Sequence, residues 1–339
     1  DGLSTIGKVF RVYDGWDIPD SLRVACKCLE GPKGLYHDGY YYLTSAEGGT
    51  AGPATSHMVI SARSRSPLGP WTNSPYNPVI HTASPRDVWW SQGHGSLVED
   101  IGGNWWMVYH AYENGYRTLG RETLLMPVEW TADHWFRIPP GARPDKAMRK
   151  PAGNDSGNGM RISDDFPGET VGLQWQFYDE GNMDRARISD HHLFLEAKSG
   201  TLADSHPLLV EPLNHAYTLE VKLTVPDSAT GGITLFYNPA GNVGVGMDRQ
   251  AVYVFSHGRK LRLAENTFGP TAFLKLVNRD NEIFLYYSTD GKSWIRLDKS
   301  LEVSGFNHNV FNGFLSLRAG LFAFGKGAVQ FSHFRYQGE

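Results

Sequence analysis

Turn residues separate short aromatic and β-branched runs along most of this chain, and this pattern restricts the fold to β-structure. An Asp-Gly turn divides residues 35–43, a Gly-Gly turn divides residues 98–110, and a second Asp-Gly turn divides residues 286–294. No segment shows the 3.6-residue hydrophobic period of a long amphipathic helix. The 38 glycines, 19 prolines and 13% aromatic residues agree with many tight turns. We therefore predict an all-β protein.

The chain is long enough, at 339 residues, for two domains. Residues 139–160 are rich in Pro, Gly, Asp and Asn and offer almost no apolar side chain to bury, so we predict a linker there. Residues 1–138 repeat one hairpin design, as the blades of a β-propeller do. Residues 161–339 contain enough short alternating strands for a sandwich of two sheets.

The charge of the chain excludes two classes of partner. The net charge is -4 and no basic run occurs, so the sequence predicts neither nucleic-acid binding nor attachment to an anionic membrane. No stretch of about 18 apolar residues is present, which excludes a spanning helix. The expected ligand is neutral.

Cys26 and Cys28 are the only cysteines. In an extended strand their side chains would point to the same face, too close in sequence to pair, so we predict buried free thiols rather than a disulfide. A Cys-x-Cys pair without neighbouring His or Cys is also weak support for zinc. The thiols do not identify a compartment, and secreted, periplasmic and cytoplasmic locations all stay open.

Five separated motifs lie between residues 20 and 138. They are Glu30 in Leu-Glu-Gly-Pro-Lys, Glu-Gly-Gly-Thr at 47–50, Thr55–Ser64, Gly93–Val98 and Leu119–Thr123. Together these motifs resemble glycoside hydrolase family 43. The two segments that open the second domain, Asp164-Asp165-Phe166 and Leu173–Phe177, resemble the concanavalin-like domain that follows the propeller in many members. The resemblance implies the C-terminal blades of a five-bladed β-propeller followed by a concanavalin-like β-sandwich.

The resemblance also implies roles for four residues. Glu30 corresponds to the general acid of the family. Thr50 and Arg121 correspond to sugar-contacting residues, and Arg121 also reaches the aspartate that sets the pKa of the acid. His94 corresponds to a histidine that lines the central cavity beside substrate and a water-coordinated cation, which implies a calcium ion and no organic cofactor.

Inverting glycosidases need a second carboxylate, which activates water on the opposite face of the sugar, about 6.5 to 9.5 Å from the acid. In the family this base and the pKa-setting aspartate lie in earlier blades, upstream of anything that corresponds to Asp1. No aspartate between residues 1 and 138 lies in a segment like those motifs. We therefore expect an N-terminal polypeptide of the same enzyme to complete the propeller and supply both aspartates.

The predicted function is an exo-acting, inverting glycoside hydrolase, a β-xylosidase with α-L-arabinofuranosidase activity. It would release xylose and arabinose from the non-reducing ends of xylo-oligosaccharides or arabinoxylan. Two alternatives stay open: a non-catalytic carbohydrate-binding protein, and an arabinan- or galactan-cleaving member of the same family. For His57 the choice between core hydrogen bonding and cavity lining also stays open.

Overall fold

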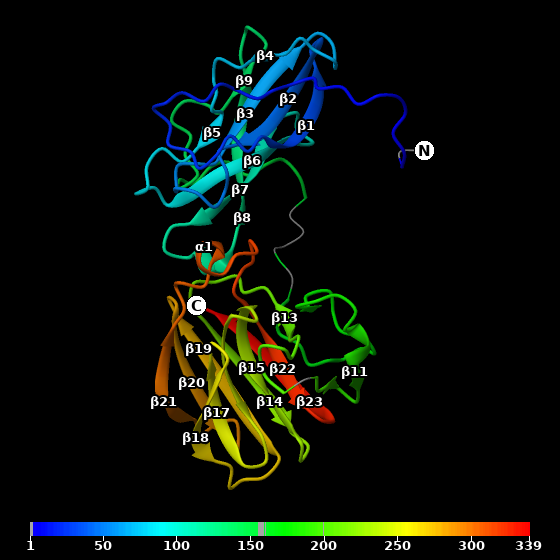
Figure 1. Ribbon diagram of the computed structural model, residues 1–339, viewed down its shortest axis with the longest axis vertical. Helices are drawn as coiled ribbons and strands as arrows, with labels where there is room; N and C mark the ends of the chain where they lie inside the picture. Colours follow the sequence, from blue (N-terminus) through cyan, green and yellow to red (C-terminus); the bar gives the residue numbers. More distant parts are fainter. Residues whose placement is uncertain (1–2, 155–158, 160, 199) are drawn as a thin grey trace. The chain divides into compact units, whose positions relative to one another are not determined.

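A computed structural model describes residues 3–154, 159, 161–198 and 200–339 (Figure 1). Strands dominate it, and the helical elements of the described residues are one α-helix, α1 (His308–Phe311), and two 3₁₀ turns, η1 (Arg117–Leu119) and η2 (Met183–Arg185). None of these helices has the length and apolar character needed to cross a membrane. The all-β prediction is confirmed.

The first compact unit contains residues 1–114 and 121–156 and holds two antiparallel sheets. In both, strands that follow one another in sequence lie side by side, except that β5 pairs with β3, which is the meander expected of propeller blades. The first sheet consists of β1 (Glu30–His37), β2 (Tyr40–Glu47), β3 (Met58–Ser64), β4 (Thr72–Asn73) and β5 (Ile80–His81). The second consists of β6 (Trp89–Glu99), β7 (Trp105–Glu113), β8 (Glu122–Trp130) and β9 (Phe136–Arg137).

The predicted Asp-Gly turn joins β1 to β2. Asp38 and Gly39 both have positive φ angles, 46° and 78°, as a two-residue hairpin turn requires. A shared core lies between the two sheets of this unit. It includes the fully buried side chains of Tyr42, Val59 and Met107.

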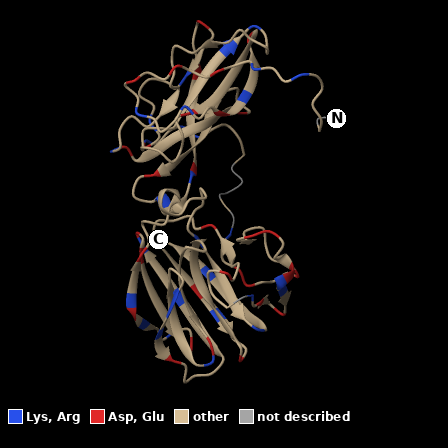
Figure 2. Cartoon of the chain, in the orientation of Figure 1, with Lys and Arg blue, Asp and Glu red and all other residues tan. Residues whose placement is uncertain are grey.

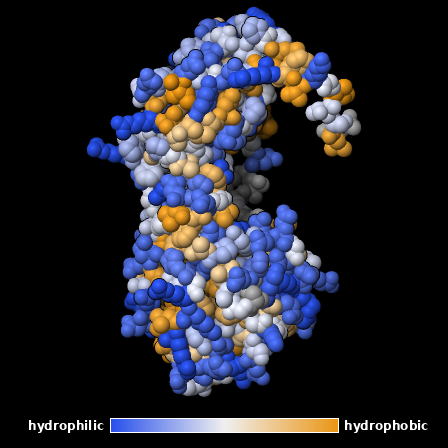
Figure 3. All heavy atoms as spheres, in the orientation of Figure 1, coloured by the Kyte–Doolittle hydropathy of each residue, from blue (hydrophilic) through white to orange (hydrophobic). Residues whose placement is uncertain are grey.

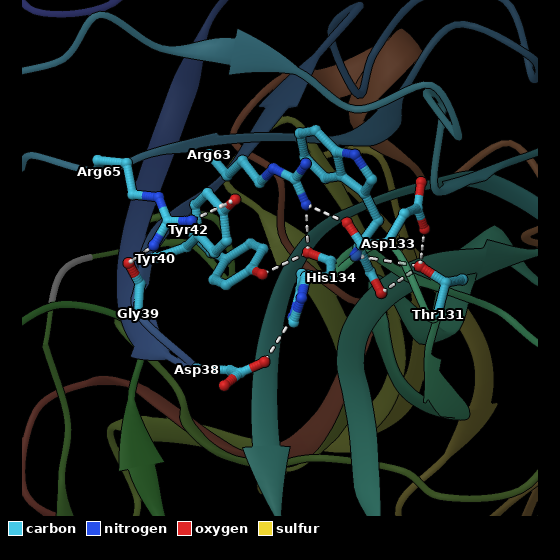
Figure 4. Close-up of polar contacts among 10 residues, drawn as sticks. Asp38, Gly39, Tyr40, Tyr42, Arg63, Arg65, Thr131, Asp133 and His134 are labelled. Carbon is cyan, nitrogen blue, oxygen red and sulfur yellow. Dashed lines mark hydrogen bonds and ion pairs between the residues drawn. The ribbon is translucent and has the colours of Figure 1, made fainter.

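A polar network joins the first sheet to the loop between β8 and β9 (Figure 4). Arg63 Nη1 donates to the carbonyl oxygens of Asp133 and His134, both at 2.6 Å, and the Tyr42 hydroxyl donates to the same His134 carbonyl. The guanidinium also lies 4.0 Å from the centre of the Trp135 ring. His134 Nδ1 in turn lies 2.5 Å from Asp38 Oδ2 in the β1–β2 turn. One arginine therefore satisfies two carbonyls and stacks on an aromatic ring.

Replacing Arg63 by Lys should lower the free energy of unfolding by about 1 to 2 kcal/mol, because an ammonium group cannot keep both hydrogen bonds and the stacking. The control is Arg65→Lys, since Arg65 is exposed, donates hydrogen bonds to Gly39 and Tyr40 of the β1–β2 hairpin, and lies over the Tyr40 ring. That change should cost less than about 0.5 kcal/mol. Thermal unfolding checks both variants, and equal losses would contradict a specific role for Arg63.

The second unit contains residues 115–120 and 157–339. Its described part holds two seven-stranded antiparallel sheets, as the sandwich prediction expected. The first sheet has the order β10 (Gln176–Phe177), β13 (Leu208–Val210), β22 (Arg318–Gly325), β15 (Ala229–Asn238), β16 (Gly241–Met247), β17 (Ala251–Ser256), β18 (Arg259–Glu265). The second has the order β11 (Ala186–Ser189), β12 (His192–Glu196), β23 (Ala328–Gly338), β14 (Tyr217–Thr224), β19 (Thr271–Arg279), β20 (Glu282–Ser288), β21 (Ile295–Glu302).

Alternation along the strands builds the core of the sandwich. In β14 every second side chain is buried, so one face of the strand packs inward and the other faces outward. The predicted opening segments, 164–166 and 173–177, contribute Phe166 and Trp175, which stack with each other, and Trp175 also packs against the fully buried Phe334. The limits that the sequence suggested for the domains, 138 and 160, stay a prediction.

The prediction of free thiols is wrong, because Cys26 and Cys28 form a disulfide. The prediction assumed an extended strand, but residues 21–29 are irregular and Cys28 has a φ of 44°. The left-handed residue turns the chain so that the two Cα atoms lie 5.3 Å apart, within the range of disulfides. Cys26 is partly buried and Cys28 is exposed, so the expected burial is also wrong.

The surface of the described residues carries charges of both signs and one run of exposed apolar side chains. Figure 2 shows that positions of Lys and Arg alternate with positions of Asp and Glu along the strands and loops of each unit. Figure 3 shows hydrophobic atoms along the segment that leads from the N-terminus, where Leu3, Ile6, Val9 and Phe10 are 67% to 101% exposed. Such a run of exposed apolar side chains favours contact with another surface.

Candidate active site

Glu30 is the first residue of β1, at a point where the pairing with β2 is irregular. The register shifts between Glu30 and Lys33, so the backbone bulges beside the acid. The Glu30 side chain is 51% exposed, and its Oε1 lies 3.6 Å from His94 Nδ1. The structure therefore brings together the predicted acid and the predicted cavity histidine.

Gly31, the glycine of the Glu-Gly-Pro motif, allows this approach. Its φ is 57°, which favours glycine, and a Cβ atom there would lie 2.4 Å from His94 Nε2. The imidazole therefore occupies the space that a side chain at position 31 would need. The Glu-Gly-Pro motif therefore supplies two things: the carboxylate of Glu30, and at Gly31 the room that the His94 ring needs.

His94 owes its position to a second bulge. The pairing of β6 with β7 shifts register on both sides of Gly93, and His94 has a φ of 59°. Left-handed backbone is uncommon for residues other than glycine and is frequent at functional sites. The bulge changes the direction of the imidazole relative to a regular strand.

Two further histidines lie beside His94. The ring centres of His57 and His110 are 5.2 Å apart and nearly parallel, and those of His94 and His110 are 5.7 Å apart. One nitrogen from each of the three residues lies within 4.8 Å of the others. His57 precedes β3, His94 belongs to β6 and His110 to β7, so the cluster joins both sheets of the first unit.

Gly93 provides the room for this cluster. It lies directly opposite His110 in the β6–β7 ladder, and a Cβ atom there would lie 2.0 Å from His57 Cδ2. The His57 ring therefore packs on the bare backbone of Gly93. No ordinary side chain at position 93 is compatible with this packing.

Burial keeps two of the three imidazoles neutral. Burial first, and neighbouring positive charges including that of Arg121 second, together lower the pKa of His57 to about 4 and the pKa of His110 to about 3. His57 is fully buried. The Glu47 backbone lies near its ring, but neither nitrogen of His57 or of His110 has a hydrogen-bond partner of acceptable geometry.

The other two predicted site residues, Arg121 and Thr50, lie in different surroundings. Arg121 is exposed and immediately precedes β8, yet it is close enough to His57 and His110 to influence both electrostatically. Thr50 is buried in the turn after β2. The turn itself needs glycine, because a Cβ atom at Gly48 would lie 1.7 Å from the Ser56 carbonyl oxygen.

No role was predicted for His110 from the sequence, and the role of His57 was left open. A weak signal for His110 was available, since a histidine stands between Tyr109 and Ala111 in a run that is otherwise apolar and aromatic. Nothing in the sequence indicated that the two rings would stack, because 53 positions separate them.

A cavity of about 420 Å³ also lies in the first unit, and it does not include the four predicted site residues. Its lining includes Trp89, Gln92, Tyr109, Met126 and Arg143. Trp89 is partly buried and packs against the core of this unit. We place the candidate site at the Glu30–His94 pair because the ionisable groups converge there.

Comparison with known proteins identifies the family. Residues 1–136 match the family described as Glycosyl hydrolases family 43, and residues 163–337 match the Beta xylosidase C-terminal Concanavalin A-like domain. The chain belongs to glycoside hydrolase family 43. The family resemblance seen in the sequence is thereby confirmed.

Named relatives fall in two groups of activity. The non-reducing end α-L-arabinofuranosidase BoGH43B of Bacteroides ovatus is 38% identical over 44% of this chain and 28% of that protein. The xylan 1,3-β-xylosidase of a Vibrio species is 35% identical over 37% of this chain and 25% of that protein. These alignments thus span only about a quarter of each curated relative.

A solved structure supports the architecture over nearly the whole chain. The GH43 protein BlXynB of Bacillus licheniformis aligns with a TM-score of 0.87 at 28% identity, covering 98% of this chain and 68% of that protein. The prediction of propeller blades followed by a concanavalin-like sandwich is confirmed.

Proposed function

We propose that the protein is an exo-acting, inverting glycosidase that releases xylose, and also arabinose, from the non-reducing ends of xylo-oligosaccharides or arabinoxylan. The names of its relatives, an α-L-arabinofuranosidase and a xylan β-xylosidase, support this substrate class. The carbohydrate-binding alternative has no such support. The observation that matters most is the Glu30–His94 pair, held at 3.6 Å by the glycine of the Glu-Gly-Pro motif.

In this proposal Glu30 protonates the departing glycosidic oxygen. Its half-exposed carboxyl group is accessible to a substrate, and the ladder is interrupted directly after Glu30, between Glu30 and Lys33. Arg121 is proposed to donate hydrogen bonds to sugar hydroxyls, because a guanidinium presents several donors in a fixed plane. Thr50 keeps its proposed contact with the sugar from the turn after β2.

The base and the pKa-setting aspartate are proposed to come from an N-terminal polypeptide of the same enzyme. Two observations support this. The described residues form two sheets of the first unit, fewer than the five blades that the family resemblance implies. The exposed apolar side chains between Leu3 and Phe10 are also suited to packing against further polypeptide.

Hydrolysis of short substrates tests the function. The chain, combined with the N-terminal polypeptide that is proposed to carry the two aspartates, is incubated with xylotriose, with arabinoxylan fragments and with the 4-nitrophenyl β-D-xyloside and α-L-arabinofuranoside, and proton NMR follows the first anomer formed. We expect single xylose units with the α configuration from β-linked xylotriose, as inversion requires. Initial β-xylose would contradict the inverting mechanism. Binding of xylotriose without release of xylose would contradict catalysis altogether.

A further inference from the structure

We infer that the cavity of about 420 Å³ in the first unit is a second binding site, which takes a neutral sugar of the size of one pentose. Glu30, Thr50, His94 and Arg121 do not line this cavity, so the site is separate from the candidate active site. The inference concerns binding alone and does not depend on the proposed hydrolysis. The proposed function supplies only the choice of xylose and arabinose as probes.

The walls of the cavity come from both sheets of the first unit. The two residues of β5, Ile80 and His81, belong to the first sheet, whereas Trp89 and Tyr109 belong to β6 and β7 of the second. Residues of the segment 138–145, which follows β9, form a further wall. The volume lies within the range of about 300 to 1,000 Å³ that is common for pockets of small molecules. A framework of several strands therefore holds the cavity, rather than one loop.

Much of the lining is apolar. Val79, Ile80 and Met126 are buried side chains, and Trp89 and Ile138 are partly buried against the core of the unit. Ligand pockets are lined in this way, by hydrophobic and aromatic side chains with a few polar groups between them. A sugar ring presents C–H groups on its faces and hydroxyl groups at its edge. Its faces therefore gain free energy by burying apolar surface against these walls.

The polar groups of the lining suit hydroxyl groups. His81 is partly buried, and its imidazole makes no hydrogen bond with the residues that the structure describes. Burial lowers the pKa of this imidazole, so the ring is neutral and offers one donor and one acceptor. The Tyr109 hydroxyl donates to Gln92 Oε1 at 3.1 Å and keeps the capacity to accept. Sugar hydroxyls, which both donate and accept, match these two groups.

Hydrogen bonds fix the walls before a ligand arrives. Asp87 Oδ2 accepts from the backbone N–H groups of Ala83 and Ser84, both at 3.0 Å, which holds the loop between β5 and β6. After β9, the N–H of Ala142 donates to the Pro139 carbonyl at 3.0 Å. A preformed pocket avoids the cost of ordering its own side chains and loops on binding.

The charged groups of the lining favour a neutral ligand. Arg143 Nε and Nη2 donate to the two carboxylate oxygens of Asp145, at 2.8 and 3.0 Å, so this guanidinium is already paired. Together with Asp87, the described lining carries two carboxylates and one guanidinium, which disfavours an anion. A metal ion is not favoured either, because Arg143 occupies one carboxylate and backbone N–H groups bind the other.

Binding of free sugars tests the inference. D-Xylose, L-arabinose and D-glucuronate are titrated into the chain, alone and combined with the proposed N-terminal polypeptide, and saturation-transfer NMR and the Tm of the first unit are recorded. We expect the two neutral pentoses to bind with a Kd on the order of 1 mM and to raise the Tm by mass action. Glucuronate should bind at least about 10-fold more weakly. Absence of pentose binding, or equal binding of glucuronate, would overturn the inference.

Two matched pairs of variants assign the pentose to the cavity. His81→Phe removes the neutral donor and acceptor but keeps a ring, and Ala142→Phe fills the cavity with a larger side chain. Each should weaken xylose binding by about 10-fold or more. The controls are His192→Phe, at a partly buried position of β12, and Ala132→Phe, at an exposed position of the β8–β9 loop, and both should bind xylose as the wild type does.

Two further comparisons separate the cavity from the active site and from the N-terminal polypeptide. In a Glu30→Gln background the effect of His81→Phe on xylose binding should be the same, so a failure of catalysis and a failure of the second site are told apart. The effect should also persist when the N-terminal polypeptide is present. If it vanishes there, that polypeptide fills the cavity and the inference is wrong. Unchanged affinity in both cavity variants, or a loss in either control, would likewise overturn it.

Discussion

Replacement of Glu30 by Gln is expected to lower the rate of xylo-oligosaccharide hydrolysis by about 100- to 10,000-fold, the usual contribution of general acid catalysis. Glutamine keeps the shape of the side chain but has no proton to give to the leaving oxygen. Substrates with activated aryl leaving groups need little protonation, so their hydrolysis should fall much less. The ratio of kcat/KM for xylobiose and for an activated aryl xyloside measures this difference.

The matched control for this experiment is Glu99→Gln. Glu99 is an exposed residue at the end of β6 in the same unit, and its replacement should leave both rates unchanged. Equal losses on the two substrates in Glu30→Gln would contradict the acid role. A wild-type rate on xylobiose would contradict any role of Glu30 in the reaction.

The second large effect is expected at Gly93. Replacement by Ala would place a Cβ atom 2.0 Å from His57 Cδ2, a separation that forces the fully buried ring or the strand to move. Overpacking of this kind costs about 1 to 3 kcal/mol. The variant should therefore show a lower Tm for the first unit, because His57 can no longer occupy its position.

Gly34→Ala is the control for Gly93→Ala. Gly34 also lies in a strand of the first unit, β1, but a Cβ atom there would meet nothing within 4 Å. Alanine should be neutral or slightly stabilising at this position, because it restricts the unfolded chain more than glycine does. If Gly93→Ala and Gly34→Ala unfold at the same temperature, then His57 is not packed on Gly93 as described.

The fold could be predicted from the sequence because it depends on local signals. The Asp38-Gly39 pair supplies the two positive φ angles of a hairpin turn, and alternation along residues 217–224 gives a strand with one buried face. The disulfide could not be predicted in the same way. It depends on the left-handed conformation of Cys28, which is an unusual conformation for cysteine and leaves no mark in the residue pattern.

The site could be predicted only in part. Motif resemblance placed Glu30 and His94 in one site, and the structure brings them within 3.6 Å, although the roles of the four predicted residues stay predictions. The histidine cluster depends on contacts between distant segments and on a bulge that changes the direction of His94. Local sequence preferences contain no signal for such tertiary contacts, so no role was predicted for His110.

The two interrupted ladders beside the Glu30–His94 pair have a consequence for the mechanics of the site. At Glu30–Lys33 and at Trp90–Ser96 the regular strand pairing is broken, whereas the remainder of β2, β3 and β7 pairs without a shift. Fewer backbone hydrogen bonds hold the two stretches that present these side chains, so small displacements there do not disturb the sheets. In the proposed reaction, the carboxyl group and the imidazole would therefore adjust to a sugar ring while the regularly paired strands keep their positions.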